Sequence, residues 1–176
     1  MYILPLIVYT ILVDKDTPQC CQSHKILSEK NRQIKYGGQF TDISNDYRLG
    51  DKWYRFIFPD NLYAKIPTSP PELHFQVDRK VCGTKLAAWM NGTLPGLTDP
   101  QPVTREICFA WQGNTCGHKE YHNRFNKQTN TTEQHEVRYK TTTRVTACSR
   151  GGNTFYLYKL KRTPYCCGMH AMYCAI

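Results

Sequence analysis

The chain of 176 residues shows alternation of apolar and polar side chains far more often than helical spacing. The clearest case is the run TFYLYKL at 154–160, in which a strand would place Phe155, Leu157 and Lys159 on one face and Tyr156, Tyr158 and Leu160 on the other. Other alternating, or aromatic and β-branched, runs predict strands at 52–58, 73–77, 103–111 and 136–148. The best helix candidate is 26–34, and its apolar spacing is poor.

Segments rich in turn-forming residues separate these runs. Gly151-Gly152-Asn153 predicts a turn, and the proline-rich segments 66–72 and 93–102 predict loops. The polar segment 114–134 predicts an exposed excursion. The pattern as a whole predicts a mainly β, disulfide-rich fold of short strands with long loops.

The N-terminal residues 2–13 form an almost unbroken apolar run, YILPLIVYTILV. It is too short to span a bilayer and fits the apolar region of a signal peptide, although a buried first strand is the alternative. We therefore expect a signal peptide at 1–17, an N-terminal extension at 18–45 tied down by Cys20 and Cys21, and a domain at 46–176. No second apolar run follows, so no membrane span is expected.

Nine cysteines are the strongest compositional signal, and they indicate an oxidising compartment and structural disulfides. They are Cys20, Cys21, Cys82, Cys108, Cys116, Cys148, Cys166, Cys167 and Cys174. Because nine is odd, one thiol is left over or pairs between chains. Their spacing contains no C-x₂-C pair, and Cys116, His118 and His122 lie in a polar segment with no matching second pair, so no metal or cofactor is expected.

Two N-x-T sequons support the same compartment. Asn91-Gly92-Thr93 and Asn130-Thr131-Thr132 both lie in predicted loops and are candidate N-glycosylation sites. The rarer N-x-C sequence at Asn114 is discounted, because Cys116 is expected in a disulfide.

The formal charge of +9 fits either a polyanionic partner or simply a basic surface. The densest basic cluster is Lys159, Lys161 and Arg162. Nucleic acid is not an expected partner, because the cysteines and sequons point outside the cell. The chain lacks the nucleophile-elbow, P-loop, dinucleotide-binding and zinc-protease motifs, and no catalytic residue is expected.

Several motifs occur in the order found in one extracellular family. They are DKWYRF at 51–56, CGT at 82–84, WMNGTLP at 89–95, REICF at 105–109, FYLYKL at 155–160 and YC at 173–174. Together they resemble the eight-cysteine domain of uromodulin and of the pancreatic zymogen-granule membrane glycoprotein, over residues from about 46 to 174.

The resemblance implies an extracellular, disulfide-rich, N-glycosylated β domain. It implies the pairs Cys82–Cys174 and Cys108–Cys116, a bond from Cys148 to Cys20 or Cys21, and a bond from the other of these two to Cys166 or Cys167. The family usually has a further cysteine shortly before its W-Y-R-F motif, where this chain has Asn45-Asp46.

The expected function is therefore that of a secreted, non-catalytic adhesion or recognition module that displays N-glycans or binds extracellular proteins, glycans or microbial adhesins. One alternative is a sulfated-glycan binder using Lys140, Lys159, Lys161 and Arg162. The other is a secreted enzyme inhibitor that uses the short Cys108–Cys116 loop.

Overall fold

The computed structural model describes residues 21, 23–36, 45–70, 82–84, 86–109, 116–117, 119–164 and 170–176. Within the range 119–138 it does not describe the side chains of 119, 120, 122, 124–126, 133, 135 and 137. The predicted signal peptide 1–17, the predicted strand 73–77, and Cys20, Trp111, His118, Cys166 and Cys167 lie outside the described residues.

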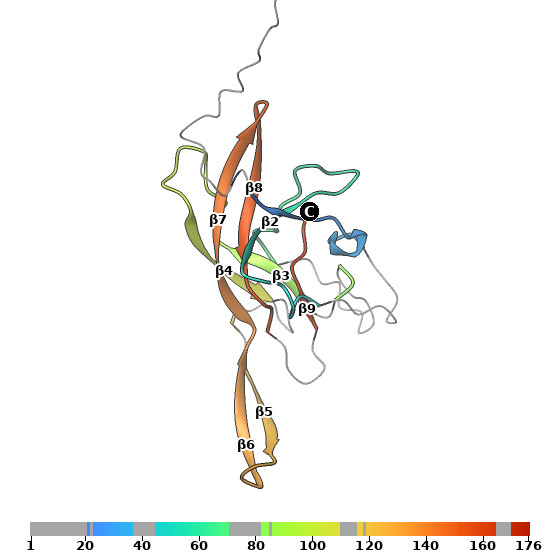
Figure 1. Cartoon of the computed structure of the whole chain (residues 1–176), viewed down its shortest axis with the longest axis vertical. Helices are drawn as coiled ribbons and strands as arrows, with labels where there is room; N and C mark the ends of the chain where they lie inside the picture. The colour runs from blue at the N-terminus through green and yellow to red at the C-terminus, as the bar shows by residue number, and fades with distance from the viewer. Residues whose placement is uncertain are drawn as a thin grey trace, which may run out of the picture.

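The described chain forms a seven-stranded sheet in the order β1-β2-β8-β7-β4-β3-β9 and a separate two-stranded sheet of β5 and β6 (Figure 1). The β1–β2 and β3–β9 pairs are parallel, and the other pairs are antiparallel. The strands are β1 Lys25–Leu27, β2 Lys52–Phe56, β3 Leu86–Asn91, β4 Val103–Phe109, β5 Lys119–Asn126, β6 Thr131–Arg138, β7 Lys140–Arg150, β8 Asn153–Leu160 and β9 Ala171–Met172. The prediction of a mainly β fold is confirmed.

The long hairpin of β7 and β8 lies in the middle of the large sheet and follows the predicted alternation. Gly151 and Gly152 have φ angles of 59° and 79°, which suit the tight turn between two twisted antiparallel strands. Leu157 packs on one face and Tyr158 on the other, in two separate apolar clusters. The sequence therefore predicted both the turn and which side chains of β8 lie on each face of the sheet.

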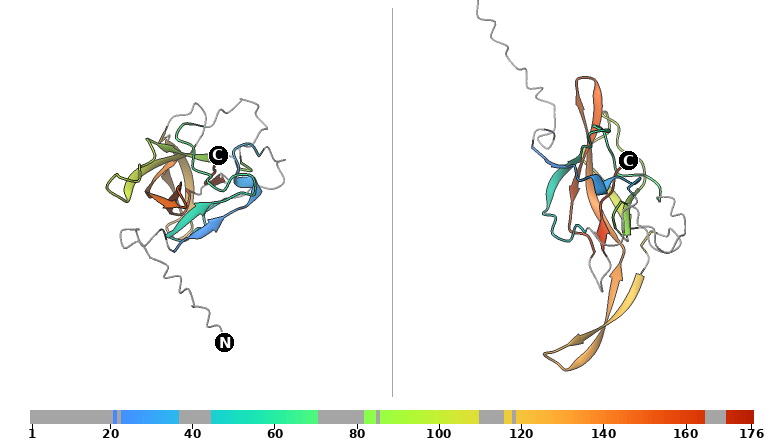
Figure 2. Two further views of the ribbon diagram at one scale, coloured as in Figure 1. Left: turned by 90° about the horizontal axis from the view of Figure 1, so that it is seen from above. Right: turned by 90° about the vertical axis from the view of Figure 1, so that its right-hand side faces the viewer.

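One apolar core contains side chains from both edge strands of the large sheet as well as from its middle. Leu27 of β1, Tyr158 of β8 and Ala171 of β9 all belong to it. The two ends of the order also approach each other, because Gln33 forms a parallel β-bridge with Ala175. The sheet therefore curls around its core, and Figure 2 shows the curled body from two further directions.

The β5–β6 hairpin corrects the prediction of a loop at 114–134. It pairs in register over eight residues, from Lys119 opposite Arg138 to Asn126 opposite Thr131. Figure 1 shows it as an arm that extends away from the body. The prediction of exposure is right for the described side chains here, including Tyr121, which is 57% exposed.

Two other predictions differ from the structure. The predicted strand 136–148 is divided between β6 and β7, with the buried Tyr139 between them. The helix candidate 26–34 instead holds β1 and a 3₁₀ turn at Lys30–Arg32, and no α-helix occurs among the described residues. None of the described helical segments has the length and apolar character needed to cross a membrane.

The hydroxyl of Tyr158 gives a first test of the core. Tyr158 is fully buried, and its oxygen accepts a hydrogen bond from the backbone N–H of Ile66 at 3.1 Å. Desolvation raises the pKa of this phenol, so it remains neutral at ordinary pH. Tyr158→Phe leaves the Ile66 N–H without its partner, so we expect urea denaturation to show a loss of about 1–3 kcal/mol in the free energy of unfolding.

Tyr156→Phe is the matched control, because the half-buried Tyr156 hydroxyl bonds to no other described residue. Equal losses of stability in the two variants would contradict the role assigned to the Tyr158 hydroxyl.

Candidate functional site

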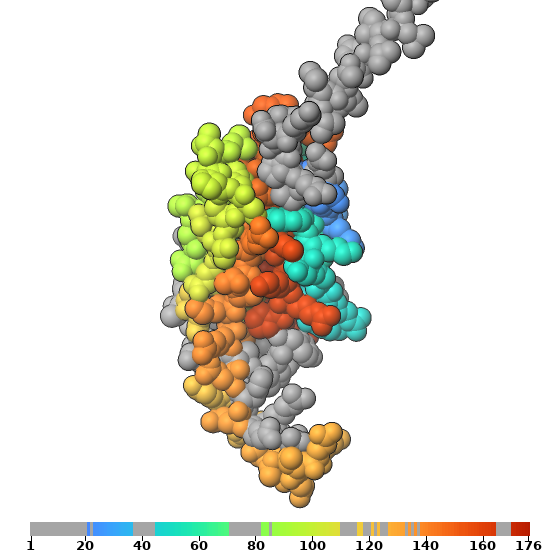
Figure 3. Space-filling view, turned by 60° about the vertical axis from the view of Figure 1, so that its left-hand side comes forward, coloured from blue at the N-terminus to red at the C-terminus, as the bar shows by residue number. Residues whose placement is uncertain are grey.

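The sequon asparagine Asn130 lies in the turn between β5 and β6, at the far end of the arm. It is exposed and has a φ angle of 54°, a left-handed conformation that asparagine adopts more readily than most residues. Thr131 and Thr132, which complete the sequon, are also exposed at the start of β6. In the space-filling view the end of the arm lies well below the body (Figure 3). Solvent surrounds this sequon on the described structure.

The second sequon asparagine, Asn91, ends β3 and is also exposed. Its Nδ2 donates a hydrogen bond to Oε2 of Glu106 at 3.3 Å, and Glu106 also receives a hydrogen bond from Nζ of Lys140 at 2.6 Å. The hydrogen bond from Lys140, followed by that from Asn91, lowers the pKa of Glu106. The left-handed φ of +118° at Gly92 then turns the chain away from β3.

Three disulfides hold the described chain together: Cys21–Cys148, Cys82–Cys174 and Cys108–Cys116. They are the pairs that the family resemblance implies for these six cysteines, and Cys21 is the member of its doublet that bonds to Cys148. The Cys108–Cys116 bond ties the segment before β5 to β4, and both cysteines belong to a small apolar cluster with Trp89. This disulfide therefore fixes the base of the arm.

The same corner contains the one group among the described residues that could resemble a metal site. A carboxylate oxygen of Glu106 and the sulfurs of Cys108 and Cys116 lie within 4.8 Å of one another. Zinc binds cysteine as the thiolate, whereas these two sulfurs are bonded to each other. The group therefore offers a single carboxylate and does not form a metal centre.

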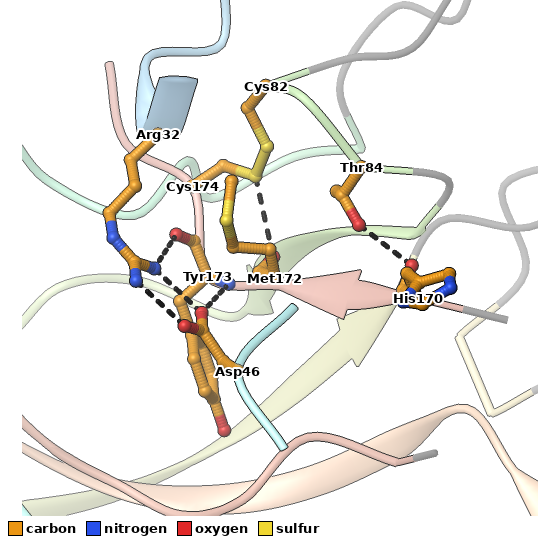
Figure 4. The surroundings of a disulfide bond; sticks show 8 residues. All are labelled: Arg32, Asp46, Cys82, Thr84, His170, Met172, Tyr173 and Cys174. Carbon is orange, nitrogen blue, oxygen red and sulfur yellow. Dashed lines mark hydrogen bonds and ion pairs between the residues drawn. A yellow bond between two sulfur atoms is a disulfide. The ribbon is translucent and has the colours of Figure 1, made fainter. Parts of the chain in front are cut away.

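A buried ion pair lies beside the Cys82–Cys174 disulfide (Figure 4). The guanidinium of Arg32 donates two parallel hydrogen bonds to the carboxylate of Asp46, at 2.7 and 2.8 Å. The same carboxylate accepts the backbone N–H of Tyr173 at 2.8 Å, and Arg32 also donates to the carbonyl of Tyr173 at 3.3 Å. Three segments that are distant in sequence therefore meet at one pair of charges.

Burial and pairing act in opposite directions on Arg32. Desolvation disfavours its charge, but the hydrogen bonds and charges of Asp46 and Glu29 outweigh that effect and raise the pKa of Arg32. The guanidinium is therefore permanently charged in an almost fully buried position. Sequence patterns gave no signal for this pair, because a single Arg and a single Asp 14 residues apart are common in any surface segment.

The basic residues singled out from the sequence do not all gather in one place. Lys159 and Lys161 line a common surface cleft, and Arg162 lines the part of the cleft that continues past Lys161. Lys140 is engaged with Glu106 instead. Arg144 of β7, which has no basic neighbour in the sequence, lies beside Lys159 because the two are paired across β7 and β8.

Comparison with known proteins gives one family. The profile of the uromodulin-like domain with eight cysteines matches residues 54–175. The chain is 27% identical to the pancreatic secretory granule membrane major glycoprotein GP2 of the dog, over 150 residues that cover 83% of this chain and 22% of that protein. The human protein of the same name is 27% identical over 158 residues, with 89% and 22% coverage.

The chain thus spans about a fifth of the length of these curated relatives. No solved structure gives a significant match to the chain.

The Arg32–Asp46 pair leads to a stability prediction. Asp46→Asn keeps the size of the side chain but removes the buried counter-charge of Arg32 and leaves only the half-exposed Glu29, so we expect the free energy of unfolding to fall by about 3–5 kcal/mol. Denaturant unfolding followed by tryptophan fluorescence measures the change. Asp60→Asn is the control, because its Lys35–Asp60 pair is largely exposed and should matter far less. A loss at Asp46 no larger than the loss at Asp60 would contradict the importance of the buried pair.

Proposed function

The chain belongs to the family of uromodulin-like domains with eight cysteines, and on that premise we propose that it is a secreted recognition module that displays N-linked glycans and has no catalytic activity. The relatives reported above are glycoproteins by name, which supports glycosylation as the property that this chain shares with them. The observation that carries the proposal is the position of Asn130 at the end of the β5–β6 arm.

Glycan display requires an asparagine that an enzyme can reach and a glycan that a partner can reach. Asn130 satisfies both requirements, because it lies in an exposed turn whose two flanking strands pair only with each other among the described strands. A glycan attached there would extend away from the body, so that a large partner could approach it without contacting the seven-stranded sheet.

Asn91 supplies a second and different display position. It is exposed at the end of β3, which lies next to the edge strand β9, and its side chain bonds to Glu106 on the neighbouring β4. A glycan on Asn91 would begin on the surface of the body rather than at the end of an arm. Partners that suit such glycans are extracellular glycan-binding proteins, among which microbial adhesins are one class.

Secretion and disulfide formation belong to the same proposal. The predicted signal peptide at 1–17 would direct the chain to the secretory pathway, where disulfides form. The six bonded cysteines have no free thiol, so none of them can act as a nucleophile. The three remaining cysteines, Cys20, Cys166 and Cys167, would form one further bond and leave one thiol.

Glycosylation of the arm can be tested by substitutions one residue apart. Thr132→Ala destroys the N-x-T sequon of Asn130, whereas Thr131→Ala changes only the middle position and leaves the sequon intact. Expressed in animal cells, the Thr132→Ala protein should lose the mass of one N-glycan and the corresponding binding to a mannose-specific lectin. The Thr131→Ala protein should retain both. Equal masses for the two variants would show that Asn130 is not glycosylated.

The secretory proposal has its own measurement. Intact mass of the unreduced, alkylated and deglycosylated protein from the culture medium should show a chain that lacks its first residues and carries one alkylated thiol. Four disulfides account for the other eight of the nine cysteines. Retention inside the cell with most thiols alkylated would overturn the proposal, whatever the state of Asn130.

A further inference from the structure

One face of the large sheet is polar in its middle, although the sheet packs apolar side chains elsewhere. The cross-strand register places Thr104 opposite Arg144 and Arg144 opposite Lys159, so the three strands β4, β7 and β8 form a polar row. Lys161 follows two residues after Lys159, just beyond the end of β8. Figure 3 shows β7 and β8 side by side on one face of the molecule.

The polar row borders a surface cleft in two adjacent parts that share lining residues. One part, of about 260 Å³, is lined by Asp51, Thr104, Thr142, Thr143, Arg144, Lys159 and Lys161. The other, of about 480 Å³, shares Asp51 and Lys161 with the first and adds Leu49, Gly50, Thr141 and Arg162. The volume of the second part lies within the usual range for small-ligand sites, and that of the first lies just below it.

Positive charge in the cleft exceeds the negative charge that could balance it. Asp51 is the one acidic residue among the described residues that line the cleft, and its Oδ2 is 3.8 Å from Nζ of Lys159. Arg144, Lys161 and Arg162 have no acidic partner among the described residues. Three cations are therefore available to an anion that enters from solvent.

From this arrangement we propose that the cleft binds an acidic polysaccharide, through its sulfate or carboxylate groups. Strands are about 4.8 Å apart and alternate residues of a strand about 6.6 Å apart, so cations on this face repeat at intervals suited to a chain that carries several anionic groups. Thr104 and Thr142, both exposed, add hydroxyls that can bond to sugar hydroxyls.

The lining favours a polysaccharide over a nucleic acid. Among the described residues that line the two parts of the cleft there is no aromatic side chain, so these residues offer a base no stacking partner. The proposed site also differs from the basic cluster considered from sequence, because Arg144 replaces Lys140. The proposal does not rest on glycan display, since the cleft is formed by the protein's own side chains.

The test compares two double variants with equal net charge. Lys161→Ser/Arg162→Ser removes two cations from the cleft, whereas Lys25→Ser/Lys127→Ser removes two exposed cations that do not line it. The probe is heparin, and the protein is deglycosylated before the measurement. Asn91 bonds to Glu106, and Glu106 is paired with Thr142 of the cleft, so a glycan on Asn91 would lie close to the cleft.

We expect the wild-type protein to be retained on heparin above the physiological ionic strength of about 0.15 M. The cleft variant should bind a heparin oligosaccharide about tenfold more weakly, as expected from the loss of charge-assisted contacts. The control variant should bind like the wild type, and Lys161→Arg/Arg162→Lys, which keeps both charges, should retain binding.

Three results would overturn the proposal. The first is elution of the wild type below physiological salt, and the second is an equal loss in the two double variants, which would indicate general charge attraction. The third is tighter binding to duplex DNA than to heparin at the same salt concentration. Thermal unfolding of each variant checks that the substitutions at these exposed positions leave the fold intact.

Discussion

The closed shape of the body depends on the buried ion pair between Arg32 and Asp46. A charge out of water is unfavourable unless it is paired and its hydrogen-bonding positions are filled, and here Asp46, Glu29 and the carbonyl of Tyr173 fill those of the guanidinium. These contacts bring the segment after β1, the segment before β2 and the C-terminal segment to one point. The Cys82–Cys174 disulfide lies next to that point, and the Gln33–Ala175 bridge continues the contact between the two ends of the sheet.

The two proposed binding surfaces lie on parts of the molecule that this closure leaves exposed. The β5–β6 arm shares no ladder with the large sheet in the described structure, and two-stranded sheets alone are only marginally stable. The stability of the arm therefore depends on its base. There the Cys108–Cys116 disulfide holds the segment before β5, and the buried Tyr139 holds the segment after β6. The basic cleft, in contrast, lies on the large sheet and the segments next to it. The two proposed surfaces can thus exist in one domain without sharing residues.

The sequence predicted the parts of the fold in which one face of a strand is apolar and the other polar. β2 and β4 have that pattern, whereas β8 was found from its run of aromatic and apolar residues and packs into apolar clusters on both faces. The Gly151-Gly152 turn could be placed because only a few residues accept its backbone angles. β3 was missed because Leu86–Met90 is buried on both faces, and its Ala, Leu and Met residues favour helices over strands. The arm was missed because polar strands do not alternate. Arg32 and Arg144 could not be found from local pattern, since their roles come from partners on other segments.

The position of Asp46 also bears on how this chain differs from its family. By the resemblance, a cysteine usually stands near this place, and here an aspartate makes a buried pair with Arg32 instead. A disulfide acts largely by restricting the unfolded chain, whereas an ion pair acts only once its partners are brought together and desolvated. The ion pair at this place therefore acts on the folded state, whereas the disulfides of the chain act largely on the unfolded state. Closure of the body at this point then depends on the complete set of hydrogen bonds around two charges, which is a more demanding condition than one covalent bond.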